Sequence, residues 1–178
     1  PRQRFAPPSQ LAFVAHATIH SLPTSTLPRV PRKHTMQQFA ALYQQLDSTT
    51  KTSERLLALA RYFRDAPPED AAWCVWFLCG ERPRRAVTVG LLQTWCAELA
   101  GLPQWLFDVS REFVGDLAET IALLLPPPAT HSNEGLHHWV TERLLPLASQ
   151  TPEQRREAVL QAWNTLPGTQ RFLFNKLL

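Results

Sequence analysis

The sequence has few of the features that mark secreted, membrane-spanning or nucleotide-binding proteins. Three cysteines in 178 residues are an odd number and too few for a disulfide framework, so they predict thiols in a reducing cytosol. No apolar run reaches the ~18 residues of a membrane-spanning helix, and residues 11–15 are too short for the core of a signal peptide. The six glycines form no phosphate-cradling loop. We therefore expect a cytoplasmic protein with no membrane partner.

Acidic residues are absent from the first 35 positions. This segment has no glycine either, but it holds six of the 16 prolines and five basic residues without a helical period. Such a composition predicts a tail that is disordered or only loosely attached. Met36 is the only methionine, so the native chain could start there and the tail would not be native; a basic DNA-binding arm is the alternative.

The overall charge is a poor guide to the partner. The net charge is +3 and the isoelectric point is about 9.1, which is typical of nucleic-acid-binding proteins. Without the five basic residues of the tail, however, 13 basic residues face 15 acidic ones, a balance of −2. Any binding to DNA must then come from a local patch of cations.

From residue 36 onward the apolar residues recur at helical spacing. Phe39, Leu42, Tyr43 and Leu46 follow the i, i+3, i+4, i+7 pattern, and no alternation typical of strands appears. Prolines and glycines separate the segments, and a Thr-Pro-Glu-Gln start signal lies at residues 151–154. We predict an all-α domain over 36–178, an irregular bundle of about eight helices, with one helix ended or bent at Pro146.

A sharp corner is predicted in the segment Phe113-Val-Gly-Asp-Leu-Ala-Glu-Thr-Ile-Ala-Leu-Leu-Leu125. Gly115 can end one helix in a left-handed conformation, while Asp116 can cap the next, with Glu119 completing a capping box. The start of the second helix would offer free N–H groups and a positive dipole end, which suit a phosphate.

Several segments resemble a known family in the right order. They are Phe39–Thr52 with its Thr-Thr-Lys-Thr turn, Trp76–Arg85 with Gly-Glu-Arg-Pro-Arg-Arg, the Val-Gly-Asp-Leu-Ala-Glu corner, and Arg171-Phe-Leu-Phe-Asn-Lys-Leu-Leu178. Together they are similar to the N-terminal DNA-binding domain of ATP-dependent DNA ligases, particularly the bacterial ones. The resemblance covers about residues 36–178.

The resemblance implies a function. In that family this domain lies over the minor groove of nicked double-stranded DNA and grips its backbone, and a nucleotidyltransferase domain of the same parent chain seals the nick with ATP and magnesium in DNA repair. The reaction needs a lysine in a Lys-x-Asp-Gly motif, but none of Lys33, Lys51 and Lys176 precedes x-Asp-Gly. We therefore expect a fragment without catalytic residues, metal or cofactor of its own, whose catalytic domains lie elsewhere in the parent.

Phosphate contacts need cations, hydroxyls or backbone N–H groups. The predicted DNA-binding residues are Thr50, Lys51, Thr52, Arg82, Arg84, Arg85, Gly115, Asp116, Arg171, Asn175 and Lys176. The alternatives are a capping role for the threonines, a solvated basic loop for the arginines, a structural role for the corner, and a contact with the next domain for the last three. The alternative function is a helical protein-interaction module without DNA binding, which the negative balance favours.

Other combinations of residues indicate packing rather than chemistry. Cys74 and Cys79 have no neighbouring histidine and lack zinc-ligand spacing, so core packing is expected of them. His137 and His138 are adjacent and should be exposed on different helix faces. The six tryptophans are expected mostly in the core.

Overall fold

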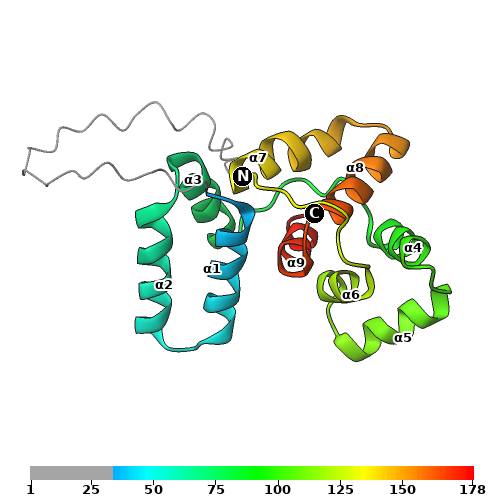
Figure 1. The fold of residues 1–178 in the computed structure, drawn as a ribbon, viewed down its shortest axis with the longest axis horizontal. Helices are drawn as coiled ribbons and strands as arrows, with labels where there is room; N and C mark the ends of the chain where they lie inside the picture. The colour runs from blue at the N-terminus through cyan, green and yellow to red at the C-terminus, as the bar shows by residue number, and fades with distance from the viewer. Residues whose placement is uncertain (1–33) are drawn as a thin grey trace, which may run out of the picture.

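A computed structural model describes residues 34–178, and the secondary structure of this part of the chain consists of helices without a strand (Figure 1). The predicted fold class is confirmed, with nine α segments in the described range instead of about eight. The helices are α1 Met36–Ser48, α2 Thr52–Asp65, α3 Pro68–Leu78, α4 Val89–Ala100, α5 Gln104–Val114, α6 Leu117–Leu124, α7 Leu136–His138, α8 Pro152–Thr165 and α9 Gly168–Leu177.

Local signals in the sequence place most helix ends. Gly101 and Gly115 end α4 and α5 in the left-handed region, at φ 65° and 79°, where a residue with a Cβ is strained. Pro68 lies in the first turn of α3. Thr151 forms the predicted capping box with Gln154, whose side chain accepts a hydrogen bond from the Thr151 N–H at 3.0 Å.

The segment around Pro146 differs from the expected α-helix. After the short α7, residues Trp139–Leu144 form a π-helical turn and Leu145–Ser149 a 3₁₀ turn. The helical path therefore neither ends nor simply bends at Pro146. It continues as a tighter 3₁₀ turn, and the proline lies at the start of this turn, where the N–H that it lacks is not required.

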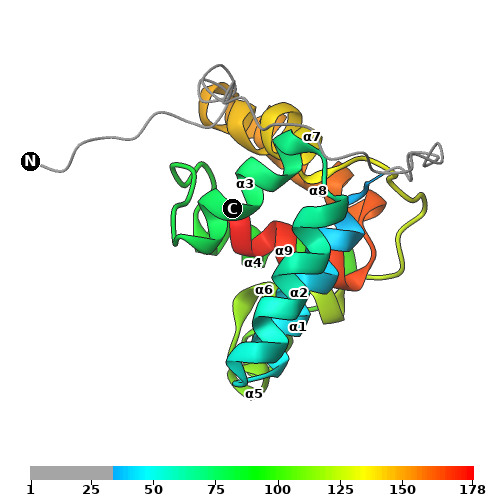
Figure 2. The ribbon, with the colours of Figure 1, turned by 90° about the vertical axis from the view of Figure 1, so that its left-hand side faces the viewer.

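Helix α9 lies in the middle of the molecule, where it contacts α6 on one side and α1 on the other (Figure 1). Helices α1 and α2 form an antiparallel pair on one side, and α4, α5 and α6 lie on the other (Figures 1 and 2). The core contains large side chains from most of these helices, including Phe39, Trp73, Phe107, Trp163 and Phe174. The middle position of α9 explains why its residues are the most completely buried of any helix described.

The first two described residues are part of the folded body, although the sequence placed them in the tail. Nδ1 of His34 lies 2.8 Å from a carboxylate oxygen of Asp70, which is buried in α3. The N–H of Thr35 donates to the side chain of Gln38 at 2.8 Å, which caps α1. The boundary therefore lies at or before His34, and residues 1–33 are outside the described range.

Asp70 also joins α3 to the loop before α7. Its second carboxylate oxygen accepts the N–H of His137 at 2.7 Å. A Cβ on Gly135 would lie 2.7 Å from a carboxylate oxygen of Asp70, so a larger residue at that point would displace this carboxylate. His137 is half-buried, and its Nδ1 accepts a 3.3 Å hydrogen bond from Trp73. The expectation that His137 and His138 are both exposed was therefore wrong. The contact with Asp70 holds this turn against α3.

The cysteines divide into two groups. Cys74 and Cys96 are fully buried. Cys79 is exposed just after α3, so the core packing that we expected of it was wrong. Burial raises the pKa of each buried thiol to about 12. Four of the six tryptophans are in the core as predicted, and Trp105 is 65% exposed.

Candidate nucleic-acid interface

The turn between α1 and α2 presents Thr50, Lys51 and Thr52 to solvent. Lys51 is the N-cap residue of α2, but its side chain forms an ion pair with Glu54 at 2.8 Å instead of capping the helix. The hydrogen bonds from Lys51 and Thr49 hold the pKa of Glu54 below its ordinary value. Because both partners are at least half exposed, this pair contributes little energy and Lys51 can exchange it for a phosphate.

The loop between α3 and α4 uses its three predicted arginines in two ways. Arg82 donates to the backbone carbonyls of Phe77 and Glu81 at 2.9 and 2.7 Å, and its guanidinium lies over the Phe77 ring. Arg84 and Arg85 are exposed and form no hydrogen bond or ion pair with the described residues. Arg82 thus fixes the start of the loop, and the next two arginines are available to a ligand.

The corner between α5 and α6 has the predicted shape but not an open anion site. The carboxylate of Asp116 accepts the N–H of Glu119 at 2.9 Å and pairs with Lys176 of α9 at 2.5 Å. Burial raises the pKa of Asp116, but the bonds from Lys176 and the Glu119 N–H lower it more, and the net pKa is below the ordinary value. The start of α6 therefore already has a carboxylate as its anion, and the side chain of Glu119 does not complete a capping box.

Helix α9 does not present the predicted cationic face. Arg171 is only 2% exposed and donates to the carbonyls of Trp163, Leu125 and Pro126. Asn175 is also buried, between the Trp163 indole and the Ala118 carbonyl. We therefore correct the assignment of both residues: they hold α9 against α6 and α8, and a guanidinium buried in this way cannot reach a phosphate. Lys176 is partly exposed and bound to Asp116.

The remaining segments lie in two regions. In both views the α1–α2 turn and the α5–α6 corner are at the same end of the molecule, at the bottom of the pictures (Figures 1 and 2). The α3–α4 loop crosses the middle of the molecule, above both turns (Figure 1). The structure thus brings two of the predicted segments to one end and places the arginine loop apart from them.

Most cations of the described range are engaged internally. Arg155, for example, donates to the carbonyls of Leu147, Ala148 and Ala86, and Arg156 pairs with Glu98. Five exposed arginines form no hydrogen bond or ion pair with other described residues: Arg55, Arg61, Arg84, Arg85 and Arg111. Sequence reasoning missed three of them, although the i, i+4 spacing of Lys51 and Arg55 beside the turn was a usable signal.

A comparison with known families decides what this helical body is. The model of the family described as DNA ligase N terminus matches residues 35–178, which is nearly the whole described range. The chain belongs to this family. Neither a comparison with curated proteins nor one with solved structures finds a match.

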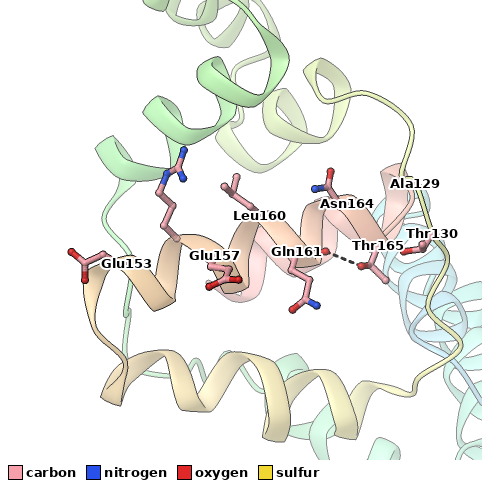
Figure 3. Close-up of a pocket in the computed structure, with 9 residues that line it drawn as sticks. Ala129, Thr130, Glu153, Glu157, Leu160, Gln161, Asn164 and Thr165 are labelled. Carbon is pink, nitrogen blue, oxygen red and sulfur yellow. Dashed lines mark hydrogen bonds between the residues drawn. The ribbon is translucent and has the colours of Figure 1, made fainter.

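One hollow on this ligase domain lies away from the interface segments. It measures about 750 Å³, is open to solvent, and follows α8 from Glu153 and Glu157 to Thr165 and the loop residues Ala129 and Thr130 (Figure 3).

Between residues 34 and 178 no group of three or more His, Cys, Asp or Glu side chains is placed to bind a metal ion. In the same range no helix has the length and apolar character needed to cross a bilayer.

Proposed function

We propose that this ligase N-terminal domain binds the backbone of nicked double-stranded DNA and holds it for the nucleotidyltransferase domain of its parent, an ATP- and magnesium-dependent ligase acting in DNA repair. The observation that supports the proposal best is that Arg84 and Arg85 are exposed and have no partner among the described residues. In a body with a net negative balance, they form an adjacent pair of free guanidinium groups in a loop braced by Arg82. Such a pair is suited to phosphate contacts.

The α1–α2 turn provides a second set of donors for the same ligand. Thr50 and Thr52 offer hydroxyls, and Lys51 and Arg55 lie one helical turn apart at the start of α2. At the α5–α6 corner, Gly115 has open space around it, so another backbone can approach closely. Asp116 and Lys176 neutralise each other there and have a structural role in this proposal.

Binding to nicked duplex DNA tests the proposal. The full 178-residue chain should bind a labelled nicked duplex at low salt, and the affinity should fall steeply between 50 and 200 mM salt, as expected for phosphate contacts that release counterions. Fluorescence anisotropy measures both quantities. No binding even at the lowest salt would contradict the proposal.

A protein-interaction role without DNA is the second candidate. It is favoured by exposed apolar side chains on α2 and α5, among them Leu56 at 60% and Trp105 at 65%. These two functions separate in the same titration, because an apolar protein contact gives no affinity for a nicked duplex.

A further inference from the structure

Helix α5 has an exposed apolar row with an acidic side. Trp105, Val109 and Phe113 follow one another at four-residue spacing and are 65%, 40% and 88% exposed. Aromatic side chains left in water in this way indicate a contact with a partner. Asp108 and Glu112 are exposed in the neighbouring row, and Glu112 has no partner among the described residues. A partner for this face must therefore be apolar and basic.

Helix α2 of the same chain has a face of that kind. Leu56, Ala60 and Phe63 form an exposed row at i, i+4, i+7 spacing, and the two large side chains are 60% and 36% exposed. Arg61 and Arg64 are exposed in the neighbouring row, and Arg61 has no partner in the described range. The two helices thus present apolar rows with charges of opposite sign beside them.

The two faces match in length and in the side on which the charges lie. At ~1.5 Å per residue the row of α5 spans about 12 Å and that of α2 about 10 Å. Viewed from outside with the N-terminus below, the arginines of α2 lie to the right of the row and the carboxylates of α5 to the left, since a right-handed helix advances by ~100° per residue. A right side meets a left side when two helices face each other in parallel.

In this parallel register the charged side chains come together in two pairs. With Trp105 opposite Leu56, Asp108 lies near the level of Arg61, and Glu112 lies near the level of Arg64. The internal bonds of these groups are weak: Asp108 accepts one bond within its own helix, and Arg64 forms an exposed ion pair with its neighbour at 3.3 Å. Such surface bonds contribute little and can be exchanged.

The two faces of one copy cannot meet each other, because α2 and α5 lie on opposite sides of the molecule (Figure 1). We propose that α2 of one copy packs in parallel against α5 of a second copy, so that the chain associates head to tail. Further copies can add at either end of such an assembly. One helix pair buries less than the ~1,200 Å² of a stable complex, so the association is weak and depends on concentration. It requires no DNA and goes beyond the proposed function.

Sedimentation of the full 178-residue chain without DNA tests the contact. The weight-average mass should rise with concentration above the 20.2 kDa of one copy. Leu56→Glu places a carboxylate against the acidic side of α5, and Phe113→Lys places a cation against the arginines of α2. Each variant alone should stay monomeric. Their equimolar mixture should form a 1:1 dimer, because each variant retains the face that the other has lost.

Leu123→Lys is the matched control, because Leu123 is 66% exposed on α6, outside both faces. This variant should associate like the unmodified chain. The melting temperatures of all three variants should be unchanged, since the replaced side chains are exposed.

A charge exchange tests the parallel register. Arg61→Glu should weaken the association about fivefold, the effect of losing an exposed ion pair. Adding Asp108→Lys in the same chain should restore it, because the pair is then formed with its charges reversed. No recovery would overturn the register.

Three results would overturn the head-to-tail contact. The first is an unmodified chain that stays monomeric up to about 1 mM, beyond which no specific affinity is expected. The second is association of either single variant with itself, which would mean that like faces meet. The third is a mixture of the two variants that stays monomeric. None of these results bears on DNA binding, so the proposed function stands or fails separately.

Discussion

The same residue type has three different roles in this domain. Arg171 is a buried hydrogen-bond donor to backbone carbonyls, Arg82 braces a loop, and Arg84 and Arg85 are exposed and free. The distinction depends on the acceptors that surround each side chain in the folded state. Charge alone, read from the sequence, does not identify the arginines that can bind a ligand.

Replacing Arg171 should therefore affect stability. Arg171→Met keeps an apolar stem but leaves the carbonyls of Trp163, Leu125 and Pro126 without this donor, so the free energy of unfolding should fall by about 3 kcal/mol. Urea denaturation measures the change. Arg61→Met, at an exposed position without a partner, should change it by less than about 0.5 kcal/mol. Equal effects of the two variants would show that the buried bonds contribute nothing.

Replacing Arg84 and Arg85 should affect binding alone. The double change to Ala should weaken binding to a nicked duplex and lower the salt slope by up to about 1.8, the value for two lost phosphate contacts, and helicity should stay the same. The control is Arg143→Ala with Arg156→Ala, which removes the same charge from exposed positions elsewhere. Anisotropy titrations compare them, and identical slopes would remove the loop from the interface.

At the level of helices and loops, the junctions depend on specific small or polar residues. Glycine ends α4 and α5, and threonine, aspartate and proline begin several helices. These signals act over three or four residues, which explains why the sequence predicted the junctions well. The π and 3₁₀ turns around Pro146 were missed because they depend on how the helix after residue 136 packs.

The loop before α7 gives a prediction about packing. Gly135→Ala should lower the free energy of unfolding by about 1–3 kcal/mol, because the added Cβ would overlap the Asp70 carboxylate and force one segment to move. Thermal or urea unfolding measures it. Gly90→Ala in α4, where the new methyl group meets nothing, should be neutral or stabilising by up to about 1 kcal/mol. A neutral Gly135→Ala would mean that Asp70 moves freely.

The α5–α6 corner gives a prediction about pH. Because the pKa of Asp116 is lower in the folded state than in the unfolded chain, its contribution to stability is present above pH ~4 and is lost as the pH falls below it. Asp116→Asn keeps a capping side chain but removes this titration. The unfolding free energy of the variant should depend less on pH between about 5 and 3, as urea titrations at several pH values would show. Parallel curves for the two proteins would contradict the assignment.

For the molecule as a whole, the fold class and the order of the helices along the chain followed from the spacing of apolar residues and from the prolines and glycines between them, whereas the candidate site followed only in part. Arg171 and Asn175 were misplaced because the side of α9 that faces inward is set by α6 and α8. Arg55 and Arg111 were missed because their lack of partners is visible only when all neighbours are placed. The burial of one pair and the exposure of the other both depend on neighbours that are far away in the sequence.

Thiol labelling tests the packing of the whole body. At pH 8 the native chain should react rapidly with one equivalent of a thiol reagent, at Cys79, because Cys74 and Cys96 are buried with pKa values raised to about 12. Denaturation should expose all three, and Cys79→Ser should abolish the rapid phase. Rapid reaction of two or three thiols in the native chain would mean that the core is not closed as described.

The contacts of His34 and Thr35 set a practical limit on how short this domain can be made. A version that starts at Met36 would lose the group that closes the first turn of α1 and would leave Asp70, buried in the first turn of α3, with one donor fewer. Recombinant versions for binding measurements should therefore begin upstream of the histidine, so that a loss of affinity is not confused with a loosened helix.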